Sequence, residues 1–156
     1  MKKNLTKILA LGMVVFSLVA CGGGSDGPDT EAPTISISKP NSTDLYKRGS
    51  DLPLIATFKD NRGLDKCVIT IEYQGVTPKQ AILKGIDTPW APAENNEKHE
   101  INFNAEKTSD VNETQLFNVP IENSCSSGTY TLTFTITDTA EEPNTTVETL
   151  DIQIGG

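Results

Sequence analysis

Apolar and polar residues alternate along much of the chain after residue 34. In three segments every second residue is apolar: 52–60, 67–73 and 130–138. Side chains of an extended chain point to opposite sides in turn, so a period of two places the apolar groups of each segment on one face. The pattern predicts half-buried antiparallel β-strands at these three segments.

Four more segments show the same alternation more weakly: 34–38, 98–104, 114–119 and 147–154. No segment has the period of about 3.6 residues that a long amphipathic helix requires. Seven strands separated by turn residues in one domain are typical of an all-β, antiparallel Greek-key sandwich. In the last strand the apolar positions change face between Val147 and Leu150, which predicts a β-bulge there.

The first 20 residues have a different pattern. Lys2, Lys3 and Lys7 lead an apolar run, 8–20, which has the layout of a secretory signal peptide and is shorter than the about 20 residues of a membrane span. The run ends in Leu-Val-Ala-Cys, which resembles the bacterial lipoprotein box. The resemblance implies that the sulfur of Cys21 is acylated and that the peptide bond before it is cleaved. The alternatives are an ordinary signal peptide followed by a chance cysteine, or a buried hydrophobic helix.

Residues 22–33 are rich in glycine, aspartate and proline, and this composition predicts a flexible tether. The chain therefore divides into a signal peptide (1–20), a lipidated tether (21–33) and a β-sandwich domain (34–156). The lipoprotein resemblance implies that Cys21 carries three acyl chains. Three chains hold a protein stably on a membrane, whereas one does so only marginally. Gly22 stands where an inner-membrane retention signal has aspartate, so the resemblance implies the outer membrane, either its periplasmic face or the cell surface.

The charge narrows the range of partners. Removal of residues 1–20 takes three of the 13 basic side chains, which leaves 10 against 21 acidic ones and a formal net charge of −11. A surface of this sign repels nucleic acid and anionic lipid, so the anchor is the only membrane contact that we expect, and we expect no nucleic acid. The remaining length fits one domain with one core, and we expect a monomer.

Three stretches together resemble bacterial immunoglobulin-like (Ig-like) domains: DTEAPTI (29–35), FKDNRGL (58–64) and GTYTLTFTITD (128–138). The chain from residue 29 onward is similar to small Ig-like lipoproteins of unknown function from Bacteroidota. The resemblance implies an Ig-like fold. It also implies that Tyr130 forms a tyrosine corner, in which the hydroxyl bonds to nearby backbone.

The sequence departs from the family pattern after the third stretch. Such domains usually continue as Asp-x-Ala-Gly-Asn, whereas Asp-Thr-Ala at 138–140 is followed by Glu-Glu-Pro-Asn, so the turn must differ. The same three residues resemble the short O-glycosylation motif of Bacteroidota envelope proteins. That resemblance implies Thr139 as the acceptor.

The predicted strand order brings four connections to one end of the sandwich: the segment before the first strand and the loops after the second, fourth and sixth strands. Their acidic side chains are Asp29, Glu31, Asp60, Asp65, Glu106, Asp110, Asp138, Glu141 and Glu142. Calcium takes about six to eight oxygen ligands, and the related cadherin-like folds bind it at this end. Calcium is the one cofactor that we consider, with Asp60 and Asp138 as its ligands. The alternative is a set of solvated loop acids without a metal.

The connection between the third and fourth predicted strands, 74–97, is long and contains Trp90, the only tryptophan. Connections longer than about 12 to 15 residues are commonly functional or disordered. Pro89 and Pro92 flank Trp90 and would hold it as a rigid aromatic contact for a glycan or protein ligand. The alternative is that Trp90 folds back to cover an open sheet edge.

We expect neither catalysis nor a disulfide. His99 is the only histidine, without the partners of a zinc site or a nucleophilic triad, and we expect it to face solvent.

If the third and sixth strands are antiparallel neighbours, Cys67 lies near Thr135. Cys125 is then about 30 Å away at about 3.3 Å per residue, which is too far for a bridge.

The sequence thus predicts a lipid-anchored envelope protein with an Ig-like binding or adhesion module that recognises a glycan or a protein. Two other classes stay open. One is a structural subunit or spacer of an envelope assembly, such as a surface fibre or a nutrient-uptake complex. The other is a carbohydrate-binding accessory protein or a glycan-active enzyme that uses paired carboxylates.

Overall fold

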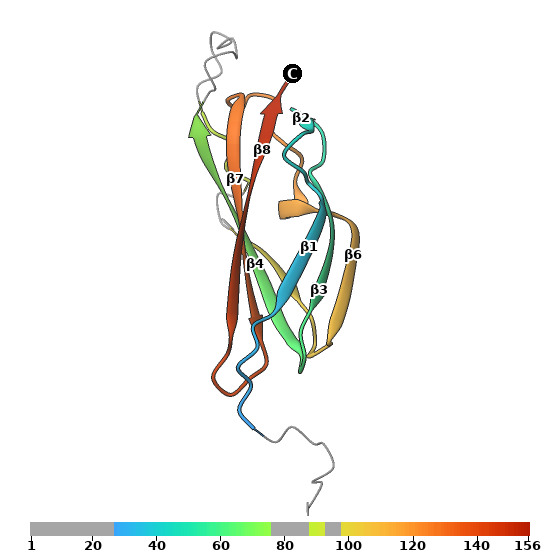
Figure 1. The fold of residues 1–156 in the computed structure, drawn as a ribbon. Helices are drawn as coiled ribbons and strands as arrows, with labels where there is room; N and C mark the ends of the chain where they lie inside the picture. The colour runs from blue at the N-terminus through green and yellow to red at the C-terminus, as the bar shows by residue number, and fades with distance from the viewer. Residues whose placement is uncertain (1–26, 76–87, 93–97) are drawn as a thin grey trace, which may run out of the picture.

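The computed structural model describes residues 27–75, 88–92 and 98–156. Strands β1, β3 and β6 form one sheet, strands β2, β8, β7, β4 and β5 form the other, and the two sheets pack as a sandwich (Figure 1). The prediction of an all-β sandwich is confirmed. In chain order the elements are β1 (Thr34–Lys39), β2 (Leu45–Lys47), β3 (Pro53–Lys59), β4 (Leu64–Gly75), β5 (Lys98–Asn102), β6 (Thr108–Gln115), the 3₁₀ turn η1 (Leu116–Asn118), β7 (Gly128–Asp138) and β8 (Thr145–Gly155).

Some predicted features lie outside the described residues, namely the signal peptide, Cys21, the first part of the tether and most of the 74–97 connection. The described end of the predicted tether, 27–33, contacts the sandwich. Pro33 is buried, and its carbonyl accepts a hydrogen bond from the Thr146 hydroxyl. In the described part of the chain, no helix has the length and hydrophobicity of a membrane span.

The alternating segments build the core. Every even-numbered residue of β7 is buried, and the threonines between them lie on the outer face of the sheet. Leu54, Ala56 and Phe58 of β3 are buried as well, and the rings of Phe58 and Phe103 are 4.8 Å apart. Full burial of a leucine or phenylalanine side chain contributes about 1.5–3 kcal/mol. The period of two therefore identified the residues that hold the sheets together.

Two strands differ from the prediction. The strand predicted at 114–119 lies at Thr108–Gln115 instead. The next residues, Leu116 and Phe117, belong to the η1 turn and bury their side chains from there. Phe117 has a positive φ of 61°. β6 is a largely polar edge strand, so its sequence carries little alternation. β2 was not predicted, because three residues cannot show a period; it pairs with β8 in parallel. The described residues therefore contain eight strands rather than seven, and one pair is not antiparallel.

The bulge predicted between Val147 and Leu150 is wrong. β7 and β8 pair without a register shift from Gly128 opposite Ile154 to Thr137 opposite Thr145. The side chain of Val147 is 59% exposed, so the apparent change of face is an apolar residue in solvent and not an inserted residue.

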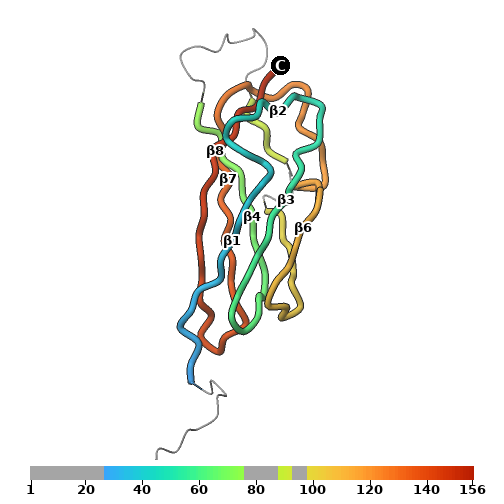
Figure 2. Tube along the Cα trace, turned by 45° about the vertical axis from the view of Figure 1, so that its right-hand side comes forward, coloured from blue at the N-terminus to red at the C-terminus, as the bar shows by residue number. Residues whose placement is uncertain are grey.

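Four connections meet at the end of the sandwich opposite the C-terminus, as the predicted strand order required (Figure 2). The Asp60 amide, after β3, donates to the Lys107 carbonyl, before β6, at 2.9 Å. The Thr139 amide, after β7, donates to the Gly63 carbonyl at 2.9 Å. Asn144 donates to a carbonyl of the segment before β1 at 3.3 Å. We call this end of the molecule the aspartate end.

The two cysteines are buried free thiols. β4 and β7 are antiparallel neighbours, as predicted, but Cys67 lies opposite Ile136 and not Thr135. Burial raises the pKa of the Cys67 thiol to about 12. The thiol is therefore protonated at neutral pH and packs as a small apolar residue.

Candidate calcium site

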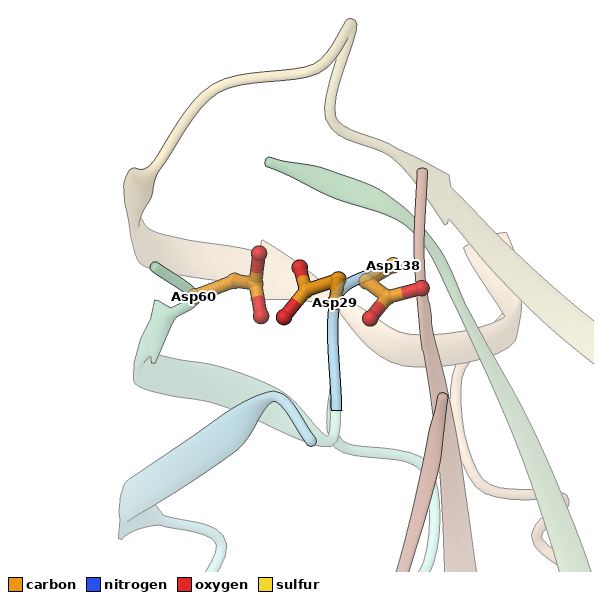
Figure 3. A group of neighbouring side chains, drawn as sticks. All are labelled: Asp29, Asp60 and Asp138. Carbon is orange, nitrogen blue, oxygen red and sulfur yellow. The ribbon is translucent and has the colours of Figure 1, made fainter. Parts of the chain in front are cut away.

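Three aspartates from three different connections converge at the aspartate end. Asp29 lies in the segment before β1, Asp60 directly follows β3, and Asp138 is the last residue of β7. One carboxylate oxygen from each lies within 4.8 Å of the other two. Figure 3 shows the carboxylates of Asp60 and Asp29 facing each other, with Asp138 beside Asp29. The two residues predicted from the sequence are thus together, and Asp29 joins them.

A tight turn positions Asp60. Its Oδ1 accepts hydrogen bonds from the amides of Arg62, at 2.8 Å, and Gly63, at 2.6 Å, so the side chain folds back over the β3–β4 loop. A Cβ on Gly63 would lie 2.7 Å from the Ala105 carbonyl oxygen, which explains the glycine. The second oxygen, Oδ2, is buried and has no hydrogen-bond partner.

Asp138 organises the turn between β7 and β8. Its Oδ1 accepts from the amides of Ala140, at 3.1 Å, and Asn144, at 2.9 Å, and its Oδ2 accepts from the Asn144 side chain at 2.7 Å. The residue is 1% exposed. Asn144 supplies two of the hydrogen bonds to this carboxylate.

The side chain of Asp29 is 2% exposed. Its Oδ1 accepts from the Asn61 side chain at 3.0 Å and from the Glu31 amide at 3.2 Å. Its Oδ2 has no hydrogen-bond partner and lies 3.7 Å from Nε of Arg62. The hydrogen bond from Asn61, and to a smaller extent the Glu31 amide and the Arg62 charge, lower the pKa of Asp29 against the opposing effect of burial. The carboxyl is therefore ionised at neutral pH.

The geometry fits a divalent cation with oxygen ligands. Calcium–oxygen distances are about 2.3–2.6 Å, so ligands on opposite sides of one ion are about 4.6–5.2 Å apart and adjacent ligands are closer. The three carboxylate oxygens, within 4.8 Å of one another, are close to this spacing. Among the described residues the cluster has a single ion pair, from Asp29 to Arg62, which leaves two negative charges uncompensated.

Two buried carboxylate oxygens without hydrogen bonds are the least satisfied polar atoms of the cluster. Buried charged oxygens are costly unless a donor or a cation contacts them. A divalent cation between Asp29 and Asp60 would contact a carboxylate oxygen of each residue. Carboxylate oxygens are the ligands that calcium prefers, and thiol or imidazole ligands, which favour other metals, are missing from the cluster.

The other acids of this end are not part of the cluster. All of them are exposed: Glu31, Asp65, Glu106, Asp110, Glu141 and Glu142. Asp65 and Asp110 accept hydrogen bonds from threonine hydroxyls instead, at 3.3 Å and 2.6 Å. These six residues are solvated acids without a place in the cluster, although Asp65 lies on β4 and Asp110 on β6 and not in loops.

Residues 19–155 match the family described as Domain of unknown function (DUF4625). The chain belongs to this family. The match spans the described domain and agrees with the expectation of a family of unknown function. No curated protein matches the chain.

Asp29 is the residue of the site that sequence reasoning did not select. It was among the nine acids of this end, but it lies in a glycine- and proline-rich stretch that predicts a tether. One feature of the sequence could have identified it: Asp29 is followed two residues later by Glu31, immediately before the first strand. An aspartate commonly accepts the amide two residues later, which fixes the backbone locally.

Thr139, the predicted O-glycosylation acceptor of this DUF4625 domain, is exposed and follows Asp138. Its hydroxyl donates to the Gly63 carbonyl at 3.2 Å. Asp138 itself is buried with its oxygens bonded, so the folded domain presents only the second and third residues of the motif. Glycosylation at Thr139 stays a prediction.

Trp90 is 3% exposed and lies in the core, so its faces are not presented to a ligand. The indole packs edge-on against Phe117, with ring centres 5.7 Å apart, and the Trp90 amide donates to the Tyr130 hydroxyl at 3.0 Å. The Tyr130 hydroxyl donates in turn to the Ser126 carbonyl at 2.7 Å, as the tyrosine-corner resemblance implied. The position of Trp90 agrees with the covering role and not with an exposed platform.

The prediction that His99 faces solvent is wrong. His99 is 7% exposed, and its Nδ1 accepts the amide of Phe117 at 3.0 Å. The reason is the η1 turn, which folds Phe117 back over β5. Burial lowers the pKa of His99, so the imidazole is neutral at neutral pH.

Proposed function

We propose that this chain is a lipid-anchored cell-envelope protein whose Ig-like domain binds calcium at the aspartate end and acts as a binding module without catalytic activity. The observation that carries the calcium proposal is the pair of buried, unpartnered oxygens, one on Asp29 and one on Asp60, in a cluster with Asp138. In a cluster of carboxylates that water hydrates, the oxygens would be exposed.

The strand order supports the Ig-like assignment. In Ig domains strands A, B and E lie in one sheet and strands C, F and G in the other. Here β1, β3 and β6 take the places of A, B and E, and β4, β7 and β8 take those of C, F and G. The tyrosine-corner hydrogen bond of Tyr130, near the start of β7, fits the same assignment.

Calcium binding also fits the proposed location. Extracellular modules bind calcium with dissociation constants of about 10⁻⁴–10⁻³ M, a range matched to the medium outside a cell. The signal sequence and the lipoprotein box at Cys21 would place the domain at the outer membrane, held through its lipid anchor. The acidic surface argues against nucleic acid, and we propose that the domain is a monomer.

Thermal unfolding of the full chain tests the calcium proposal. A ligand that binds only the folded state at ten times its dissociation constant adds about 1.4 kcal/mol to the free energy of unfolding. For a domain of this size, the midpoint should rise by about 3–5 °C between a chelator and saturating calcium. Isothermal titration calorimetry should give one site per chain.

Two matched variants locate the effect. Asp60→Asn removes a ligand charge but keeps an acceptor for the amides of the β3–β4 loop, so the calcium-dependent shift should disappear. Asp65→Asn changes an exposed acid of the same end that lies outside the cluster, and the shift should be retained. Equal midpoints for the unmodified chain in calcium and chelator would refute calcium binding.

A further inference from the structure

The three ligands belong to two parts of the chain that have different relations to the membrane. Asp60 and Asp138 end strands of the sandwich and are fixed by it. Asp29 precedes β1 by five residues and lies on the segment that leads back to Cys21. A cation on all three aspartates therefore joins this segment to the domain at a second point, in addition to the covalent start of β1.

The contacts that hold residues 27–32 on the domain concentrate at Asp29. Its side chain accepts from Asn61, its carbonyl accepts from Asn144 at 3.3 Å, and its Oδ2 is 3.7 Å from Arg62. Arg62 also donates to the Gly27 carbonyl. Thr30 and Glu31 are exposed. The contacts of residues 27–32 with the domain are therefore made through Asp29 and Arg62, whereas Pro33 is held separately by burial and by the Thr146 hydroxyl.

Repulsion between the carboxylates should make the docked position of Asp29 depend on a bound cation. Without a cation, Asp29 lies beside two other carboxylates, and among the described residues only the Arg62 guanidinium forms an ion pair with the cluster. Asp29 is the one member of the cluster that can leave by moving a chain segment outside the strands, and water would then solvate its charge. With a cation, the same three carboxylates become ligands, and leaving the cluster costs a coordination bond.

Resting on the calcium site and lipid anchor proposed above, we infer that calcium docks residues 27–32 onto the domain, and that its removal releases them. Asp29 is eight positions after Cys21, and Pro33 is 12 positions after it. At about 3.5 Å per residue, a fully extended chain would span at most about 28 Å from Cys21 to the docked Asp29 with calcium, and about 42 Å from Cys21 to Pro33 without it. Calcium would thus set how far from the membrane, and how freely, the domain is displayed.

Hydrogen exchange followed by mass spectrometry tests the inference. The full chain carrying Cys21→Ser, which cannot be acylated, is labelled in saturating calcium and in chelator. We expect the amides of 27–32, including the Glu31 amide that donates to Asp29, to exchange at least tenfold more slowly in calcium. Residues 45–50, at the other end of the molecule, are the internal control and should exchange equally in both conditions.

Two variants make the result specific. Asp29→Asn should leave 27–32 exchanging rapidly in both conditions, whereas Glu31→Gln, on the same segment and exposed, should keep the calcium response. If calcium raises the unfolding midpoint but leaves exchange of 27–32 unchanged, the site exists and the docking inference is wrong. If calcium changes neither quantity, the calcium site itself is wrong. Protection by calcium that persists in Asp29→Asn would also overturn the inference.

Discussion

The two ends of β7 show two different ways of burying polar groups. Asp138 ends the strand and is one of the three clustered carboxylates. Tyr130 is eight residues earlier, about 27 Å away at about 3.4 Å per residue, and packs against aromatic rings. We call the region around Tyr130 the tyrosine end. At the tyrosine end, the hydroxyl of Tyr130 bonds to Trp90 and Ser126 within the chain. At the aspartate end, two buried oxygens have no hydrogen-bond partner. Among the described residues, Trp90 Nε1 at the tyrosine end also lacks a hydrogen-bond partner, but it belongs to a neutral indole, whereas the unpartnered atoms at the aspartate end are oxygens of carboxylates that the proposed cation would contact.

The largest effect should come from removing the aromatic packing of the tyrosine end. Trp90→Ala deletes a side chain that is 3% exposed and packs against Phe117, so we expect a loss of about 3–5 kcal/mol of unfolding free energy. Urea denaturation measures it. The loss should be the same in calcium and in chelator, because the two ends are independent. A loss below about 1 kcal/mol would show that Trp90 is not a core residue.

The hydroxyl of Tyr130 should contribute the next largest effect. Tyr130→Phe leaves the buried Trp90 amide and Ser126 carbonyl without this partner, which costs about 1–3 kcal/mol. Tyr73→Phe is the matched control, because among the described residues its hydroxyl bonds to one partner, the half-buried Ser127 carbonyl at 3.2 Å. We expect the control to lose less in the same denaturation assay. Equal losses of unfolding free energy in the two variants would mean that the Tyr130 hydroxyl stabilises the fold no more than the Tyr73 hydroxyl does.

The same contrast separates what the sequence could predict from what it could not. Alternation located β3, β4 and β7, because each buries one face of a sheet. It failed for β6, where polar edge residues carry no period, and for Phe117, which enters the core from a turn with positive φ. The strand order was enough to bring Asp60 and Asp138 to one end. Asp29 and His99 were misjudged because tertiary contacts, to Asn61 and to the Phe117 amide, decide their burial.

Calcium dependence should be confined to the aspartate end. Asp138→Asn keeps an acceptor for the amides of Ala140 and Asn144 but removes a ligand charge, so the gain of about 1.4 kcal/mol at ten times the dissociation constant should be lost. Asp110→Asn, at an exposed acid that bonds to Thr57, is the control and should keep the gain. Thermal unfolding with and without a chelator measures both. Retention of the full gain in Asp138→Asn would place the cation elsewhere.

The smallest effect should be a pH dependence near η1, which lies away from the aspartate end. The imidazole of His99 is buried and accepts the Phe117 amide, and burial lowers its pKa below the ordinary value of 6.5. The unfolded chain then binds the proton more readily than the folded chain, so the free energy of unfolding should fall as pH falls from above 6.5 through the pKa of the folded state. His99 is the only histidine, so the slope of stability between pH 7.5 and about 5 reports mainly on it. His99→Gln keeps an acceptor that does not titrate and should flatten this slope in calcium and in chelator alike. A slope that survives in the variant would assign the proton to another group and remove His99 from the account of what holds this region together.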